Sequence, residues 1–323
     1  MSAPRHSNPL VRDFQDSRPP GEADLASFRK AREWLGGRLL AAQRAEKTGP
    51  ETWCNILLGC WICDSLTGAL GSEFPQTIRA IGTVLTHGGR QRRADWSKTP
   101  PTLALIAASL FARYQIYVDF LHGNAGCVRQ AHTFLASVPW GKARDEVAFY
   151  EKRLLMHRMG CITKPKSATL TEVVRFAQAL PLADLGPGLE QLLGLISSAT
   201  ELGHRSVELE TACVWMEDMV LGFAMSGLRK YELTAGCRWM RAARYLGMDG
   251  ERLAACLEFL RLHERPEGPF GYYATAEPPS VVKLPKTPLP CFIDTTLNLP
   301  VTVECLWTLA ETTTPWRLFS AIC

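Results

Sequence analysis

Apolar residues recur along most of this chain at the spacing of a helix. Leu25, Phe28, Leu35 and Leu39 begin the pattern, and their intervals place them on one helical face. Asp24 precedes this run and has a side chain suited to an N-cap. No stretch shows the sustained alternation of apolar and polar residues that is typical of a half-buried strand. The pattern therefore predicts an all-α protein.

Prolines and glycines separate the predicted helices. Thr169 and Glu172 have the spacing of a capping box, which predicts a helix start. The predicted helices span residues 25–43, 51–70, 75–86, 102–121, 128–137, 144–158, 171–180, 187–203, 206–226, 230–246, 250–264 and 301–311. The helix at 51–70 is apolar on nearly all sides, which indicates burial. Antiparallel helical hairpins in this order predict an α/α-toroid or a curved α-solenoid.

The two ends of the chain lack this periodicity. Residues 1–23 are rich in Pro, Ser, Arg and Asp, and we expect a disordered tail before a single helical domain at 24–323. Residues 265–300 carry eight prolines among several aromatic residues. A loop of that length in a compact chain is commonly functional, so we expect this Pro/aromatic-rich loop to lie over the helical body.

Composition narrows the class of protein. The chain has 323 residues, of which 46% are hydrophobic and 21% charged, as in soluble globular proteins. The net charge of +4 is too small to imply a nucleic-acid partner, and nucleotide-binding glycine motifs are absent. Charges interrupt the apolar stretches 103–121 and 211–228, so we expect no transmembrane segment. The N-terminus lacks the apolar core of a signal peptide, and a cytoplasmic location is expected by elimination.

The 11 cysteines are the one unusual count. Most stand in apolar runs, where a free cysteine behaves as a small buried hydrophobe. Cys60 and Cys63 have thioredoxin-like spacing, but they fall in the middle of a predicted helix with no strand before them. No second CxxC pair would complete a zinc site, and no metal site is predicted. Cys127 follows a Gly-containing loop and is the cysteine whose setting best suits a reactive thiol.

Two adjacent acids, Glu217 and Asp218, interrupt the apolar stretch 211–228. Neighbouring helical residues point about 100° apart, so one carboxylate is expected to project into a cavity with a raised pKa. Such a group is suited to acid/base chemistry or to stabilising a cation. Glu210, seven residues earlier, lies on the same face as Glu217. The alternative is a narrow solvent-exposed stripe on an amphipathic helix.

Asp119 and His122 form a second candidate pair, because residues three apart share a helical face. A carboxylate can orient a histidine that acts as a base or a metal ligand. Alternatively, His122 simply stabilises a helix C-terminus. Basic residues also repeat at every third position in Arg238, Arg241 and Arg244, which favours a solvated basic face over a clamp for an anion.

Residues 253–273, LAACLEFLRLHERPEGPFGYY, and the helix at 301–311 that follows resemble hairpin units of α/α-toroid proteins. In terpene-cyclase-like and lanthionine-cyclase-like proteins, a helix likewise ends in a Gly- and aromatic-rich turn before an inward-facing helix. The chain has neither a DxDD nor a DDxxD motif, so the resemblance does not imply terpene cyclisation.

A second resemblance covers more of the chain and is to an uncharacterised all-helical family found mainly in actinobacteria. The central helix of that family carries a Thr-His pair, then aromatic residues and an Asp-Phe-Gly end. The corresponding helix here reads EDMVLGFAMSG over residues 217–227. Asp218 replaces the histidine and Met225 the aspartate, so a shared catalytic role is not carried over.

These features predict a cytoplasmic bacterial helical enzyme of specialised, natural-product metabolism. Its expected chemistry is acid/base catalysis or cation stabilisation on a largely apolar small molecule or acyl chain in a central cavity. The expected catalytic residues are Glu217, Asp218, Asp119 and His122, and the expected substrate-binding residues are Glu210, Trp215, Phe270, Tyr272 and Tyr273. The alternative is a non-catalytic helical-repeat scaffold that binds a protein partner. No cofactor is specified.

Overall fold

The all-α class is confirmed. The computed structural model describes residues 21–45, 48–87, 99–114, 162–180, 185–205, 213–271 and 298–318, with residues 153, 154, 157 and 207. Within these ranges the chain forms ten α-helices and no strand. The helices are α1 Glu22–Arg44, α2 Pro50–Thr67, α3 Phe74–His87, α4 Pro101–Arg113, α7 Leu170–Gln178, α8 Leu185–Ala199, α9 Val214–Arg229, α10 Leu233–Tyr245, α11 Ala254–Leu262 and α13 Leu299–Thr313.

Several predicted helix ends are confirmed and others are corrected. Thr169 and Glu172 form the predicted capping box, which also lowers the pKa of the Glu172 carboxyl because it accepts the Thr169 N–H and O–H. Asp24 is not the N-cap of α1, because Gly21 occupies that position and Asp24 lies in the first turn. Helix α9 begins at Val214 rather than near Ser206. The predicted helix at 128–137, most of that at 144–158 and residues 1–20 of the tail lie outside the described residues.

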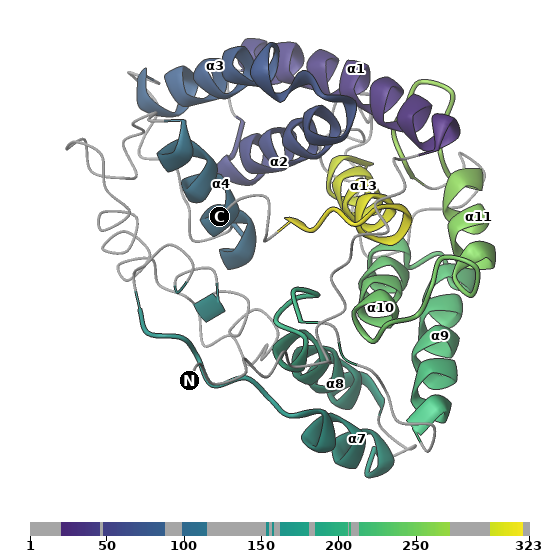
Figure 1. Ribbon diagram of the computed structural model, residues 1–323. Coiled ribbons are helices and arrows are strands. Elements are labelled where there is room, and N and C mark those ends of the chain that lie inside the picture. The colour runs from purple at the N-terminus through teal and green to yellow at the C-terminus, as the bar shows by residue number, and fades with distance from the viewer. Residues whose placement is uncertain are drawn as a thin grey trace, which may run out of the picture.

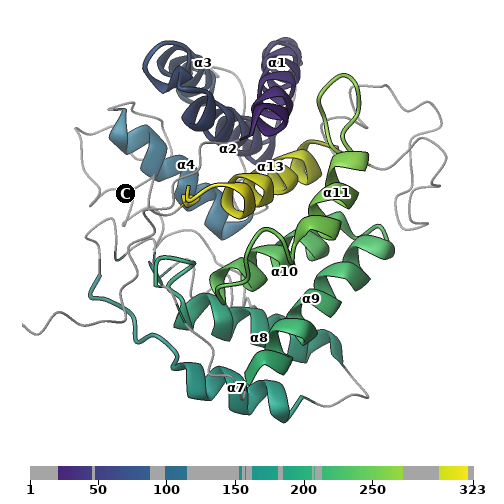
Figure 2. The same cartoon turned by 45° about the vertical axis from the view of Figure 1, so that its right-hand side comes forward.

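The helices form two layers (Figures 1 and 2). An inner row consists of α4, α2, α13, α10 and α8. Each of these helices packs against the next in this spatial order, which differs from their order in the sequence. An outer row covers it: α1 and α3 pack on α2, α9 packs on α10 and on α11, and α7 packs on α8. Among the described helices, outer and inner ones alternate in sequence from α1 to α10. This is the arrangement expected of helical hairpins.

Helices α2 and α13 occupy the inner row because their sequences are mostly apolar. In α2, every residue from Trp53 to Asp64 is buried, as its apolar sequence predicts. In α13, most residues from Leu299 to Thr312 are buried as well. Removing this apolar surface from water is the main term that holds the two layers together.

Helix α13, near the C-terminal end of the chain, packs between α2 and α10. It therefore connects the N-terminal helices with the later ones. A second junction lies at the edge, where Arg261 of α11 donates to Asp24 of α1 over 2.7 Å. Beside it, Ser27 donates to Glu264 over 2.5 Å. The toroid or solenoid arrangement stays a prediction, since residues 115–150, which join α4 to later helices, lie outside the described ranges.

The pair α9 and α10 is the most closely packed. A three-residue connection turns the chain back, and a side chain at Gly227 would meet the backbone nitrogen of Gly236 at 2.9 Å. Because neither residue has a side chain, the two backbones approach closely and fix the rotation of α10 about its axis. That rotation decides which residues of α10 face α13.

Among the described helices, none is both long enough and apolar enough to cross a membrane.

Candidate functional site

The acids Glu217 and Asp218 lie near the N-terminal end of the outer helix α9 and share one partner. Both are bound by the guanidinium of Arg252, with 2.6 Å between its Nη2 and Asp218 Oδ1. The Asp218 side chain is 68% exposed and that of Glu217 is 18% exposed. This placement agrees with the alternative of a solvent-exposed stripe. A catalytic role for the pair stays a prediction.

The structure does not gather the other predicted site residues around these acids. Trp215 is exposed on α9. Phe270 is fully buried, and its backbone exchanges hydrogen bonds with the Thr302 hydroxyl of α13. Five predicted residues lie outside the described ranges: Asp119, His122, Glu210, Tyr272 and Tyr273. Cys127 lies outside them too.

The seven described cysteines are free thiols; six are packed in the core, as predicted for most cysteines, and Cys213 is partly exposed. Cys60 and Cys63 are both buried in α2, and burial raises the pKa of Cys60 to about 12. The described residues contain no group of three or more metal-ligating side chains. The CxxC pair is therefore part of the buried core.

Iodoacetamide at pH 8 should leave Cys60 and Cys63 unmodified in the folded chain. The thiolate is the nucleophile, and a pKa of about 12 leaves roughly one thiol in ten thousand ionised at that pH. Peptide mass spectrometry after labelling, first of the native chain and then in urea with an isotopic reagent, measures this. Cys213, which is partly exposed, is the internal comparison. Equal labelling rates at Cys60 and Cys213 would contradict the prediction.

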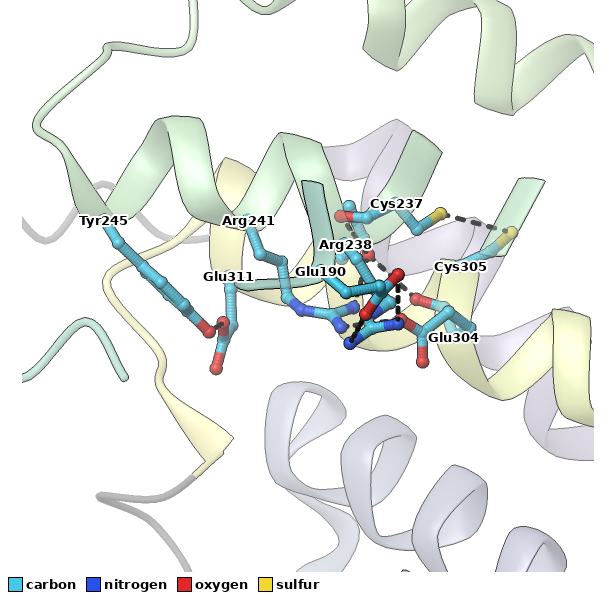
Figure 3. Close-up of polar contacts among 9 residues, drawn as sticks. Glu190, Cys237, Arg238, Arg241, Tyr245, Glu304, Cys305 and Glu311 are labelled. Atoms are coloured by element: carbon cyan, nitrogen blue, oxygen red, sulfur yellow. Dashed lines mark hydrogen bonds and ion pairs between the residues drawn. The ribbon is translucent and has the colours of Figure 1, made fainter. Parts of the chain in front are cut away.

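A polar cluster that the sequence interpretation missed lies between the inner helices α10 and α13 (Figure 3). We call it the inner polar cluster, and it consists of Arg241, Tyr245, Glu304, Thr308 and Glu311. Its α10 members stand four residues apart, and its α13 members are spaced by four and three, so each set occupies one helical face. The prediction that Arg238, Arg241 and Arg244 form a solvated basic face is wrong for Arg241, whose surface is only 7% exposed.

Arg241 is held on three sides. Its Nη2 donates to Glu304 Oε1 over 2.6 Å, and its Nη1 donates to the Thr308 hydroxyl over 2.8 Å. The guanidinium carbon lies 4.0 Å from the ring centre of Trp307, a cation–π contact. Burial alone would lower the pKa of Arg241, but the charges of Glu304, Tyr245 and Glu311 and the hydrogen bond to Glu304 together outweigh burial, and the pKa is raised. Arg241 therefore stays charged inside the protein.

Glu311, like Thr308, has no exposed surface. Its Oε2 accepts a 2.5 Å hydrogen bond from the Tyr245 hydroxyl, and its Oε1 accepts the backbone N–H of Leu318 over 2.9 Å. Burial, and then the nearby Glu311 charge, raise the pKa of Tyr245 well above its usual value. Tyr245 therefore remains a protonated donor at neutral pH.

The cluster opens toward solvent at its α8 side. There Arg238, one turn before Arg241, meets Glu190 of α8 through both guanidinium nitrogens, at 3.0 and 3.3 Å. The side chains are 29% and 50% exposed for Arg238 and Glu190, against 8% and 17% for Arg241 and Glu304. Exposure thus falls from Glu190 through Glu304 to Glu311.

A strained turn supports the deep end of the cluster. Glu201, Leu202 and Gly203 follow α8 with φ angles of 49°, 57° and 79°, a conformation that side chains other than glycine rarely adopt. Gly203 lies directly against the Tyr245 ring. Strain of this kind persists only where the surroundings hold it, and it is concentrated at functional sites.

Compared with protein-family models, with curated proteins and with solved structures, the chain matches none of them.

Proposed function

We propose that this chain is a helical enzyme that performs acid/base chemistry on a largely apolar small molecule or acyl chain, with the inner polar cluster as its polar centre. One observation supports it most: three ionisable side chains, Arg241, Tyr245 and Glu311, are buried together between two inner helices. Apolar residues of similar size would often hold two helices together at least as well as buried charges. Buried, mutually perturbed titratable groups are also typical of active sites.

Each member has a role that its position suits. Glu304 is the most accessible carboxylate of the cluster, and Arg241 fixes one of its oxygens, so Glu304 is suited to accept a proton from substrate. Arg241 stays charged and is suited to stabilise negative charge that develops on the substrate. The hydrogen bond from Tyr245 to Glu311 positions the face of α10 that carries Arg241. Glu217 and Asp218 are not used, because both bind Arg252 on the outer layer.

Replacement of Glu304 by glutamine should lower substrate conversion 100-fold or more, about the contribution of one general base. The glutamine carbonyl still accepts from Arg241, so the fold is retained while the proton acceptor is lost. The assay incubates purified chain with an apolar solvent extract of the source organism and follows all small molecules by mass spectrometry. Leu40→Ser on the exposed face of α1 is the control and should retain conversion.

Two outcomes would overturn this proposal. One is that no compound in the extract changes with the wild-type chain relative to heat-denatured chain. The other is that E304Q converts the same compound at the wild-type rate.

The second candidate, a protein-binding scaffold, is favoured by the apolar side chains that α9 exposes, Val214, Trp215 and Met225. It predicts the opposite pattern from the enzyme. Loss of function would follow substitution of Trp215 and not of Glu304.

A further inference from the structure

We propose that Arg238 is the binding point for a substrate carboxylate, and that Glu190 occupies this position when no substrate is bound. The inference rests on the proposed function and names the substrate class more closely, as a carboxylic acid with an apolar body. Arg238 and Glu190 meet at the exposed edge of the inner polar cluster, beside Arg241 and Glu304 (Figure 3).

The geometry of the Arg238 pair is that of carboxylate recognition. Two guanidinium nitrogens meet two different oxygens, with Nη2–Oε2 at 3.0 Å and Nη1–Oε1 at 3.3 Å. The planar fork of arginine matches a carboxylate in this two-pronged way, whereas a lysine ammonium does not. Any ligand carboxylate can take the place of the Glu190 side chain with the same two contacts.

Exposure decides which of the two arginines can exchange its partner. Arg241 and Glu304 are nearly buried, and separating such a pair would leave an unpaired charge in the interior. Glu190 is half exposed and can turn into water when it leaves Arg238. An ion pair at such a position contributes little to stability, so a ligand displaces it at small cost. Arg238 is therefore the exchangeable site and Arg241 the fixed one.

The position also links binding to the proposed chemistry. Arg238 and Arg241 are three residues apart on α10, so a carboxylate on Arg238 places the adjoining part of the ligand beside Glu304 and Arg241.

Titration calorimetry with decanoate tests the inference, with decanamide as an uncharged ligand of the same length. Wild type should bind decanoate at least 10-fold more tightly than decanamide. R238M should lose at least 10-fold in decanoate affinity, because a two-pronged charged contact is removed, and R238K should lie between them. E190Q should tighten binding about two- to fivefold, because the competing carboxylate is gone.

The gain expected for E190Q cannot arise from misfolding, so it keeps the test decisive even if R238M is destabilised. Equal binding of decanoate and decanamide, or unchanged affinity in E190Q, would overturn the carboxylate site. Glu304-dependent conversion of the extract without decanoate binding refutes this inference alone. Decanoate binding without any conversion refutes the enzymatic proposal alone.

Discussion

Replacement of Glu311 by alanine should lower the free energy of unfolding by about 3–5 kcal/mol, because two buried donors lose their acceptor at about 1–3 kcal/mol each and a cavity is left. The donors are the Tyr245 hydroxyl and the Leu318 N–H. Water cannot replace the carboxylate, since Glu311 has no exposed surface and Tyr245 is only 6% exposed. Urea unfolding followed by far-UV circular dichroism measures the change.

Glu311→Gln separates hydrogen bonding from charge in this prediction. The glutamine oxygen can still accept the Leu318 N–H, and its amide can donate to the Tyr245 oxygen, so E311Q should lose roughly 1–2 kcal/mol, the range of one altered hydrogen bond. Tyr245→Phe, which removes the other partner, should fall in the same range and couple to E311Q in a double-mutant cycle. If E311A lost less than 1 kcal/mol, the carboxylate would not be what joins α10, α13 and Leu318.

Local sequence patterns predicted much of the fold. Burial of α2 follows from its composition alone, and the start of α7 follows from the Thr169–Glu172 capping box. Both features depend on residues at most a few positions apart, so a single sequence contains them. The start of α1 was misplaced because Gly21 and Asp24 are both acceptable near a helix N-terminus, and no local rule separates them.

The inner polar cluster could not be predicted in the same way. Arg238, Arg241 and Arg244 look equivalent in sequence, yet Arg241 alone of the three is buried. The difference arises because α13, more than 60 residues later, packs on that face of α10. One signal was present: Glu304 and Glu311 are the acids of an otherwise apolar helix, seven residues apart and on one face. Glu210 and Glu217 have the same spacing of seven residues.

The ion pairs of Glu217 and Asp218 could not be predicted for a related reason. The sequence shows two acids in an apolar stretch but not the partner that satisfies them, Arg252, which is 34 and 35 residues away. An acid on a mostly apolar helix points either to a cavity or to solvent. The choice depends on whether the helix belongs to the inner or the outer layer, and α9 belongs to the outer one.

Gly203→Ala should destabilise the chain by about 2–5 kcal/mol, as the sum of two terms. The first is conformational: Gly203 has a φ of +79°, where a Cβ costs about 1–2 kcal/mol. The second is steric: the added carbon would lie 2.5 Å from Tyr245 Cδ1 and 3.2 Å from Arg317 Nε, and overpacking of this kind costs about 1–3 kcal/mol. Urea unfolding measures the sum.

Gly68→Ala is the matched control for this substitution. Gly68 has the same φ of +79°, but a Cβ there would meet nothing within 4 Å, so only the conformational term of about 1–2 kcal/mol applies. The difference between the two variants therefore measures how firmly the turn presses on Tyr245. Because the Tyr245 ring must move to admit the new carbon, G203A should also weaken its bond to Glu311, and the near-UV tyrosine signal should change in G203A but not in G68A. Equal destabilisation by the two variants, with an unchanged tyrosine signal, would show that the turn does not position Tyr245.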